Sequence, residues 1–340
     1  MKRSSVARII SLVVFLAAAA VIILQSHNMS PFSTAPPPIH PAPAGSLSLV
    51  TEPTDGISPE LNLINGATKS IDLTMYELED LNVEQALVAA QHHGVNVRVL
   101  LNHGYYGSPS SANQAAYNYF LANQVPVHWT PSYFALTHQK TLVVDGKTAS
   151  IMTFNFTPKY YPTGRDFAVN DTDAKDVAAI EAAFDSDWNA HKTTAPAGDD
   201  LVWSPGSEPE MLSLIDSAKY SLQIYNEEMA DTNVEKALEN AARRGVNVQV
   251  VMTDSSSWQT AFEQLTAAGV KVHTYARSAS TYIHAKMIIA DGKTAFVGSE
   301  NFSPTSLDKN RELGIVLNDP NIIASLGQTF ASDYQSSTAF

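Results

Sequence analysis

The chain has 340 residues, 44% of them hydrophobic and 16% charged, so it can bury one large core or two medium ones. It contains no cysteine, which excludes disulfides, thiolate metal sites and a cysteine nucleophile. The formal net charge is −13, and because residues 1–45 hold three basic and no acidic residues, the remainder carries −16. Such an acidic body repels phosphate backbones, so no nucleic-acid partner is expected.

Residues 1–30 have the features of a signal peptide or an N-terminal membrane anchor. Lys2, Arg3 and Arg8 precede an apolar stretch that covers residues 9–24. This length fits either alternative, and no Ala-x-Ala cleavage site follows directly, which favours the anchor. Residues 31–45 contain six prolines and predict a semi-rigid linker. We therefore expect an extracytoplasmic protein that is secreted or anchored at a membrane surface.

Residues 46–192 and 199–340 are two copies of one sequence pattern. Segments 81–99 and 232–250 each predict a helix that begins near Asn82 or Asn233, ends at a glycine and leads into a strand of alternating valines. Segments 142–149 and 288–295 each place Asp-Gly between two apolar runs, which indicates a hairpin. A further helix closes each copy. The pattern predicts an α/β protein with two similar α/β/α sandwich halves, related by pseudo-two-fold symmetry.

A short polar motif occurs once in each half. His138, Lys140 and Asp145 form a His-x-Lys-x4-Asp pattern, which is repeated 146 residues later. Further polar residues follow each copy at equivalent positions. The residues concerned in the second half are His284, Lys286, Asp291, Ser299, Asn301 and Glu312, and those that follow the first motif are Thr153, Asn155 and Asp166.

These residues resemble the phospholipase D superfamily, whose signature is His-x-Lys-x4-Asp followed by Gly-Ser/Thr-x-Asn. The resemblance covers roughly residues 46–340 and implies an active site at the interface of the halves, built from one motif of each, so that a monomer is an internal pseudo-dimer. The first copy departs from the signature, because Met152 stands where the family has glycine. Methionine cannot replace a glycine that requires an unusual backbone angle.

Displacing an alcohol from a phosphodiester requires a nucleophile, a proton donor for the leaving group and cationic groups around the phosphoryl oxygens. His138 and His284 can divide the first two roles, and Lys140 and Lys286 can stabilise the oxygen charge without a metal. In the family the N-terminal histidine is usually the nucleophile and forms a phosphohistidine. The near-symmetric sequence leaves that assignment open.

The remaining residues of the two motifs receive supporting roles. Thr153, Asn155, Ser299 and Asn301 are candidate hydrogen-bond donors to the phosphate. Asp166 and Glu312 are expected to fix the imidazole tautomers. Asp145 and Asp291 precede glycines and are expected to shape the hairpin turns. No metal or cofactor is required by this chemistry.

The leading hypothesis is a phospholipase D, a phosphoric diester hydrolase that degrades glycerophospholipids to phosphatidic acid and the headgroup alcohol. One alternative is a cardiolipin-synthase-like phosphatidyltransferase, in which a lipid alcohol replaces water. Another is an exported phosphodiesterase nuclease, which the acidic body disfavours. Two tyrosine pairs, 105–106 and 160–161, either line a lipid-facing rim or pack into the core and loops.

Overall fold

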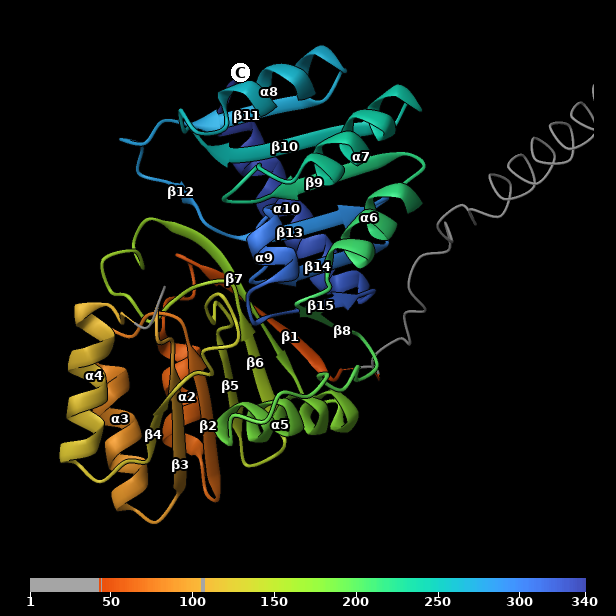
Figure 1. Ribbon diagram of the computed structural model, residues 1–340. Coiled ribbons are helices and arrows are strands. Elements are labelled where there is room, and N and C mark those ends of the chain that lie inside the picture. Colours follow the sequence, from red (N-terminus) through yellow and green to blue (C-terminus); the bar gives the residue numbers. More distant parts are fainter. Residues whose placement is uncertain (1–42, 44, 105–107) are drawn as a thin grey trace, which may run out of the picture.

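The computed structural model describes residues 43, 45–104 and 108–340 (Figure 1). The predicted N-terminal segment 1–30, nearly all of the proline-rich linker and the tyrosine pair 105–106 lie outside these residues. Within the described part of the chain, no helix combines the length and apolar character needed to span a membrane.

The first half forms a mixed sheet in the order β1-β7-β6-β5-β2-β3-β4. The parallel strands β2, β3 and β4 alternate with helices, whereas β5, β6 and β7 are joined as antiparallel neighbours. Its elements are β1 (Leu47–Glu52), α2 (Ser58–Gly66), β2 (Ser70–Met75), α3 (Leu81–His92), β3 (Asn96–Leu101), α4 (Ser111–Ala122), β4 (Val127–Trp129), β5 (Thr141–Val144), β6 (Thr148–Met152), β7 (Gly164–Asp171) and α5 (Ala174–Trp188).

The second half repeats this order as β8-β15-β14-β13-β9-β10-β11, with β16 added at the far edge. The halves lie one above the other in Figure 1, the first in red to green and the second in teal to blue. The second half contains β8 (Leu201–Ser204), α6 (Glu208–Ser217), β9 (Ser221–Tyr225), α7 (Thr232–Arg243), β10 (Asn247–Thr253), α8 (Gln259–Ala267), β11 (Lys271–Tyr275), β12 (Tyr282–Ile283), β13 (Lys286–Ala290), β14 (Thr294–Gly298), α9 (Pro304–Asp308), β15 (Glu312–Leu317), α10 (Pro320–Ser336) and β16 (Thr338–Ala339).

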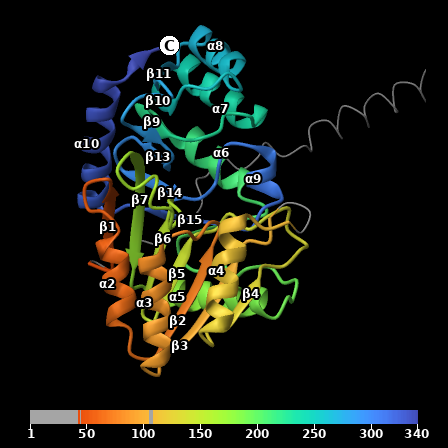
Figure 2. The same ribbon diagram turned by 90° about the vertical axis from the view of Figure 1, so that its left-hand side faces the viewer.

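Each sheet carries helices on both faces, which confirms the predicted α/β class with two similar halves. Helices α2, α3 and α4 share a buried cluster with one face of the first sheet, and α6, α7 and α8 do the same in the second (Figures 1 and 2). A third cluster contains buried side chains of α5, α10 and strands from both sheets. The two halves therefore share this third cluster, in addition to the cluster that each half has of its own.

The repeated helices α3 and α7 begin slightly before the expected asparagines. Asp80 and Asp231 are the N-caps, and their carboxylates accept hydrogen bonds from the backbone N–H groups of Asn82 and Asn233. The helices end before a glycine with positive φ, +93° at Gly94 in the first half. An aspartate cap and a left-handed glycine are strong local signals, so this part of the fold follows directly from sequence.

The Asp-Gly pairs form the two predicted hairpin turns. Asp145 and Gly146 both have positive φ, +57° and +61°, as a type I′ turn requires. The Asp145 carboxylate also accepts hydrogen bonds from the backbone N–H groups of residues 68–70, and Asp291 does the same with residues 219–221. Burial opposes ionisation, but these bonds outweigh it and hold the pKa of Asp145 at about 2. Both aspartates tie the turn to the start of the neighbouring strand.

Backbone hydrogen bonds join the two halves next to the His-x-Lys motifs. Strand β12 of the second half pairs with β7 of the first, and Thr137 makes the reciprocal bridge to Arg311. The carbonyl of Arg165 accepts from the N–H of Ala285 at 2.8 Å, and that of Arg311 accepts from the N–H of His138 at 2.9 Å. Each motif is therefore positioned by the opposite half.

The side chains of the same two arginines clamp the halves together. Arg311 Nε lies 2.8 Å from Asp187 of α5, and Arg165 Nε lies 2.6 Å from Asp333 of α10. The partners in each pair come from opposite halves and are largely buried. A buried ion pair that loses one partner leaves an uncompensated charge in a low-dielectric interior.

We predict that Arg311→Met lowers the free energy of unfolding by about 3–5 kcal/mol, because it leaves Asp187 buried without its partner. Urea unfolding monitored by circular dichroism measures the change. The matched control is Lys175→Met, which removes a solvent-exposed pair with Asp199 and should leave the free energy of unfolding nearly unchanged. Equal effects of the two substitutions would contradict the interface clamp.

Candidate active site

The two motif histidines meet where the halves join. His138 lies three residues before β5 and is 8% exposed, and His284 lies between β12 and β13. Both line one cavity of about 230 Å³, together with Asp166, Asn155 and Asn301. The interface site that the resemblance implied is therefore present as a single cavity with one motif from each half.

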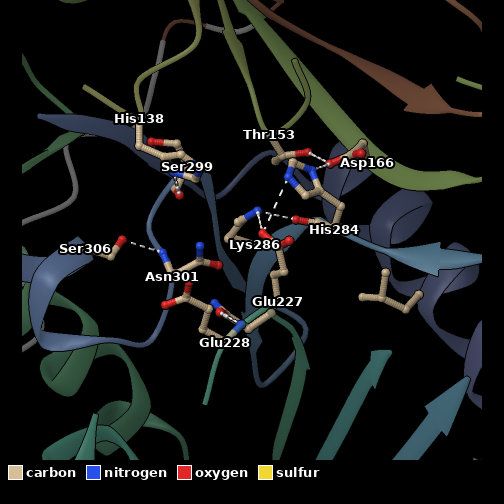
Figure 3. A network of polar contacts seen from close by, with 12 residues as sticks. His138, Thr153, Asp166, Glu227, Glu228, His284, Lys286, Ser299, Asn301 and Ser306 are labelled. Atoms are coloured by element: carbon tan, nitrogen blue, oxygen red, sulfur yellow. Dashed lines mark hydrogen bonds and ion pairs between the residues drawn. The ribbon is translucent and has the colours of Figure 1, made fainter. Parts of the chain in front are cut away.

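The histidines are paired crosswise with the carboxylates. His138 Nδ1 lies 2.8 Å from Glu312 Oε2 of the second half. His284 Nδ1 lies 2.8 Å from Asp166 Oδ1 of the first half, and Figure 3 shows this second pair. His138 Nδ1 also lies 3.1 Å from the carbonyl oxygen of Ser299. Carboxylate and carbonyl oxygens only accept, so Nδ1 of His138 carries a proton and leaves Nε2 as the free atom.

The electrostatic surroundings of His138 keep its imidazole neutral. Burial and the neighbouring charge of Lys140 lower the pKa of His138 to about 4, and the carboxylate of Glu312 only partly opposes them. Glu312 is fully buried, yet the hydrogen bond from His138 and the charge of Lys140 hold its pKa below the usual range against burial. An unprotonated Nε2 at neutral pH is the state that a nucleophilic imidazole requires.

The side chains of both motif lysines are buried close to their motif histidines. Lys140 and Lys286 are at most 1% exposed. Lys286 Nζ donates to the carbonyl of its own motif histidine at 2.6 Å, and Lys140 makes the same contact with His138. Burial and the charge of Lys286 lower the pKa of Lys140 to about 7. Two adjacent ammonium groups in a buried site are strongly destabilising unless an anion joins them.

Among the expected phosphate-binding residues, the asparagines reach the cavity and the hydroxyl residues do not. Asn155 and Asn301 line the cavity, and their side-chain oxygens have no hydrogen-bond partner. Thr153 Oγ1 instead donates to Asp166 Oδ1 at 2.5 Å and accepts from Phe167 N–H. The hydroxyl groups make hydrogen bonds to neighbouring strands and side chains, so they are not positioned to contact a phosphate in the cavity.

Ser299 is the hydroxyl residue of the second half and follows the same rule. Its side-chain oxygen accepts a hydrogen bond from the backbone N–H of Leu313 at 3.2 Å. The side chain is fully buried, so it fixes the loop after β14 against β15. Its backbone carbonyl, by contrast, contacts His138 Nδ1. The sequence pattern correctly selected Ser299, but its backbone carbonyl, rather than the expected hydroxyl, contacts the active-site histidine.

The departure at Met152 has a packing explanation rather than a backbone one. The equivalent Gly298 lies in β14 without a positive φ, so the expected need for an unusual angle is wrong. A Cβ there would come within 2.5 Å of Gly314 Cα and of the buried Glu300 carboxylate. In the first half Ala168 and Phe154 stand where the second half has Gly314 and Glu300, and Met152 is accommodated with no exposed surface.

Sequence reasoning missed Glu227. Its carboxylate lies 3.0 Å from Lys286 Nζ and 3.5 Å from His284 Nε2 (Figure 3). Tyr282 donates to its other oxygen at 2.5 Å. Although burial favours the neutral form, the charges of Lys286 and His284 hold the pKa of Glu227 well below its usual range. Comparing the two sequence repeats could have pointed to Glu227, because the first half has a different kind of residue at the equivalent position.

Tyr76 is the equivalent residue of the first half. In the first half β2 pairs with the motif hairpin through Ile71, and in the second half β9 does so at the equivalent position through Leu222. Tyr76 and Glu227 each lie five residues after that position. The Tyr76 ring packs edge-on against His138 at 4.6 Å, and Lys140 Nζ lies 5.1 Å from its centre. An aromatic ring thus faces one histidine and an ionised carboxylate faces the other.

No set of three or more histidine, aspartate or glutamate residues is arranged to hold a metal ion in the part of the chain that the structure describes. The available chemistry is that of two imidazoles and two asparagine side chains around one cavity, together with the two buried lysines. This set can attack, protonate and charge-stabilise a phosphoryl group.

A family model described as "Cardiolipin synthase, PLD-like domain" matches residues 61–188 and again residues 211–334. The chain belongs to this family. The major cardiolipin synthase of Bacillus subtilis is 26% identical over 342 residues, covering 87% of this chain and 70% of that protein. A cardiolipin synthase of Clostridium perfringens is 27% identical over 235 residues, covering 58% of this chain and 49% of that protein.

Solved structures share the fold of this family member. A phosphatidylserine synthase of Haemophilus influenzae has a TM-score of 0.69 at 12% identity, with 89% of each chain covered. A polyphosphate kinase of Porphyromonas gingivalis has a TM-score of 0.66 at 16% identity, covering 84% of this chain and 46% of the kinase. At these identities the likeness concerns the arrangement of the two halves and not the substrate.

These comparisons correct the main functional expectation from sequence. The matched relatives from Bacillus, Clostridium and Escherichia are named cardiolipin synthases, which are phosphatidyltransferases. The expected phospholipase D hydrolase, with its role in lipid degradation, is therefore wrong. The error arose because the paired motif reports the attack on phosphorus and contains nothing about the alcohol or water that resolves the intermediate.

We predict that the His138 imidazole stays neutral throughout pH 5.5–8, because its pKa is about 4. Proton–nitrogen NMR of 15N-histidine-labelled protein measures the titration. Lys140→Met removes the adjacent positive charge and should raise this pKa. A His138 signal that titrates between pH 6 and 7 in the unsubstituted protein would contradict the assignment.

Proposed function

We propose that this protein is a phosphatidyltransferase of the cardiolipin synthase type, which moves a phosphatidyl group from one glycerophospholipid to the hydroxyl of a second. The observation that carries the proposal is the shared cavity, in which two crosswise-paired histidines from a cardiolipin synthase domain pair face each other. Because one chain supplies both motifs, a monomer contains the complete site.

In the first half-reaction His138 Nε2 attacks phosphorus. The new P–N bond forms as the P–O bond to the headgroup breaks, and His284 donates a proton to the departing oxygen. The asymmetry of the cavity supports this division of roles. His138 is neutral beside Tyr76, whereas the Glu227 carboxylate lies 3.5 Å from His284 Nε2.

In the second half-reaction the acceptor hydroxyl attacks the phosphohistidine. His284 removes its proton, the P–N bond breaks and His138 is regenerated neutral, so atoms and charge balance over the cycle. Lys140, Lys286, Asn155 and Asn301 stabilise the phosphoryl oxygens in both steps. Asp166 and Glu312 act through the imidazoles and hold their Nδ1 protons.

We predict that His138→Asn and His284→Asn each reduce the transfer of a phosphatidyl group between phosphatidylglycerol molecules by at least about 1,000-fold. Labelled lipid in detergent micelles and chromatography of the product measure the rate. Acid-labile label should accumulate on His138 only in the His284→Asn variant. The exposed His93→Asn variant is the control and should retain full activity.

The proposal fails if phosphatidic acid and free glycerol are the only products even at high lipid-alcohol concentration. Label on His284 rather than His138 would reverse the two roles while leaving the transfer intact. Activity that disappears with chelation, with neither histidine labelled, would exclude the phosphohistidine scheme.

We also propose that the catalytic body works outside the cytoplasm at a membrane surface, secreted or anchored by residues 1–30. The basic residues before the apolar stretch support this orientation. Protease added to spheroplasts should degrade the anchored body, or culture medium should contain it. A body that stays protected until the cells are lysed would contradict the proposal.

A further inference from the structure

The catalytic cavity has an acidic wall that the transfer chemistry leaves unused. Five carboxylates line the cavity, those of Glu52, Glu77, Asp166, Glu227 and Glu228. Asp166 is occupied by His284, and Glu227 by Lys286. The other three face a site that must accept an anionic phosphodiester. These three further acids, of which Glu52 has no hydrogen-bond partner, oppose the binding of an anion unless the substrate also brings a positive charge.

Among these carboxylates, Glu52 gives the clearest indication of a binding site. It is 2% exposed, and neither of its carboxylate oxygens has a hydrogen-bond partner. Burial, followed by the charges of Asp166, Glu60 and Asp55, raises its pKa to about 7. Glu300 and Asp200 are also buried with both carboxylate oxygens unpartnered, but Glu52 lines the catalytic cavity, where a ligand can supply the missing contact.

The position of Glu52 places this wall on the side of the leaving group. Glu52 ends β1 and is the cross-strand partner of Asp166 in β7. Asp166 binds His284 Nδ1, and His284 protonates the departing alcohol in the proposed cycle. Cross-strand neighbours lie about 5 Å apart, so the headgroup that leaves at His284 is released within reach of Glu52.

The second half has no counterpart to this carboxylate. The strand partner of Glu312 is Ser204, which is equivalent to Glu52, and its hydroxyl donates to the carbonyl of Ser306. At this strand position the repeat therefore carries a cavity-lining acid in the first half, beside His284, and a serine in the second. A subsite on one side distinguishes the headgroup that leaves from the acceptor that enters on the other.

Aromatic rings stand beside the acids. Tyr161 and Tyr282 line the same cavity, and the Tyr282 ring lies 5.9 Å from that of His284. Carboxylates combined with aromatic faces are a recurrent environment for organic ammonium groups. A glycerol headgroup can donate hydroxyl hydrogen bonds to such a wall but cannot neutralise its charge.

We propose that Glu52, supported by Glu77 and Glu228, forms a subsite for the ammonium group of an amino-alcohol headgroup, so that the phosphatidyl donor is a zwitterionic lipid such as phosphatidylethanolamine. This inference rests on the proposed function and specifies its donor. The phosphate lies between the histidines and the ammonium group lies against Glu52.

The first experiment compares phosphatidylethanolamine and phosphatidylglycerol as donors in mixed micelles with a common lipid-alcohol acceptor. The unsubstituted protein should prefer the zwitterionic donor. Glu52→Gln should lower kcat/KM for phosphatidylethanolamine by about 10- to 100-fold, the loss expected for one buried charged contact, and for phosphatidylglycerol by less than about 3-fold. Equal losses for both donors, or an unchanged preference, overturn the proposal.

Glu60→Gln is the matched control. Glu60 is also a fully buried glutamate whose pKa is raised to about 7, chiefly by burial, but it bonds to Ser150 and does not line the cavity. The donor preference should be unchanged in this variant. If Glu52→Gln does not fold, the half-buried Glu77→Gln takes its place and should shift the preference in the same direction.

A binding measurement separates this inference from the transfer itself. Calorimetry of the His138→Asn variant should show tighter binding of glycerophosphoethanolamine than of glycerophosphoglycerol, and Glu52→Gln should abolish the difference. Binding preference without any transfer product would retain the subsite and reject the proposed function. Transfer without binding preference would do the reverse.

Discussion

The crossed pairing of each histidine with the carboxylate of the opposite half is the interaction on which the rest of the site depends. His138 meets Glu312 and His284 meets Asp166, both at 2.8 Å. Neither half alone holds an oriented imidazole, because the acid that fixes its tautomer lies on the other sheet. The fused halves therefore have to dock closely, and the shared core and the two arginine pairs accomplish this.

In each half, an arginine and an acid that are adjacent in sequence contribute to stability and to the active site, respectively. Arg165 and Asp166 are adjacent on β7, and adjacent side chains of a strand point to opposite faces. The arginine reaches the opposite closing helix, while the aspartate reaches the opposite histidine. Arg311 and Glu312 repeat the arrangement from the second half. Docking and active-site assembly are thus one structural event.

The repeat is symmetric in backbone but not in charge. Glu227 replaces Tyr76, and Glu52 replaces Ser204, so the surroundings of His284 are more acidic than those of His138. A symmetric site would leave the two imidazoles interchangeable. Burial and the charge of Lys140 keep the His138 imidazole neutral, whereas His284 contacts two carboxylates, and this difference is the basis of the proposed nucleophile and acid.

The sequence by itself determined the two-fold repeat, the Asp-Gly hairpins and the identity of the motif residues, because caps, turns and short motifs are local signals. Only the tertiary structure decided which acid meets which histidine, since those partners lie 174 and 118 residues apart. It also moved Thr153 and Ser299 from phosphate contacts to support, and revealed Glu227 and Glu52. Their places depend on how two sheets pack, and no local pattern encodes that packing.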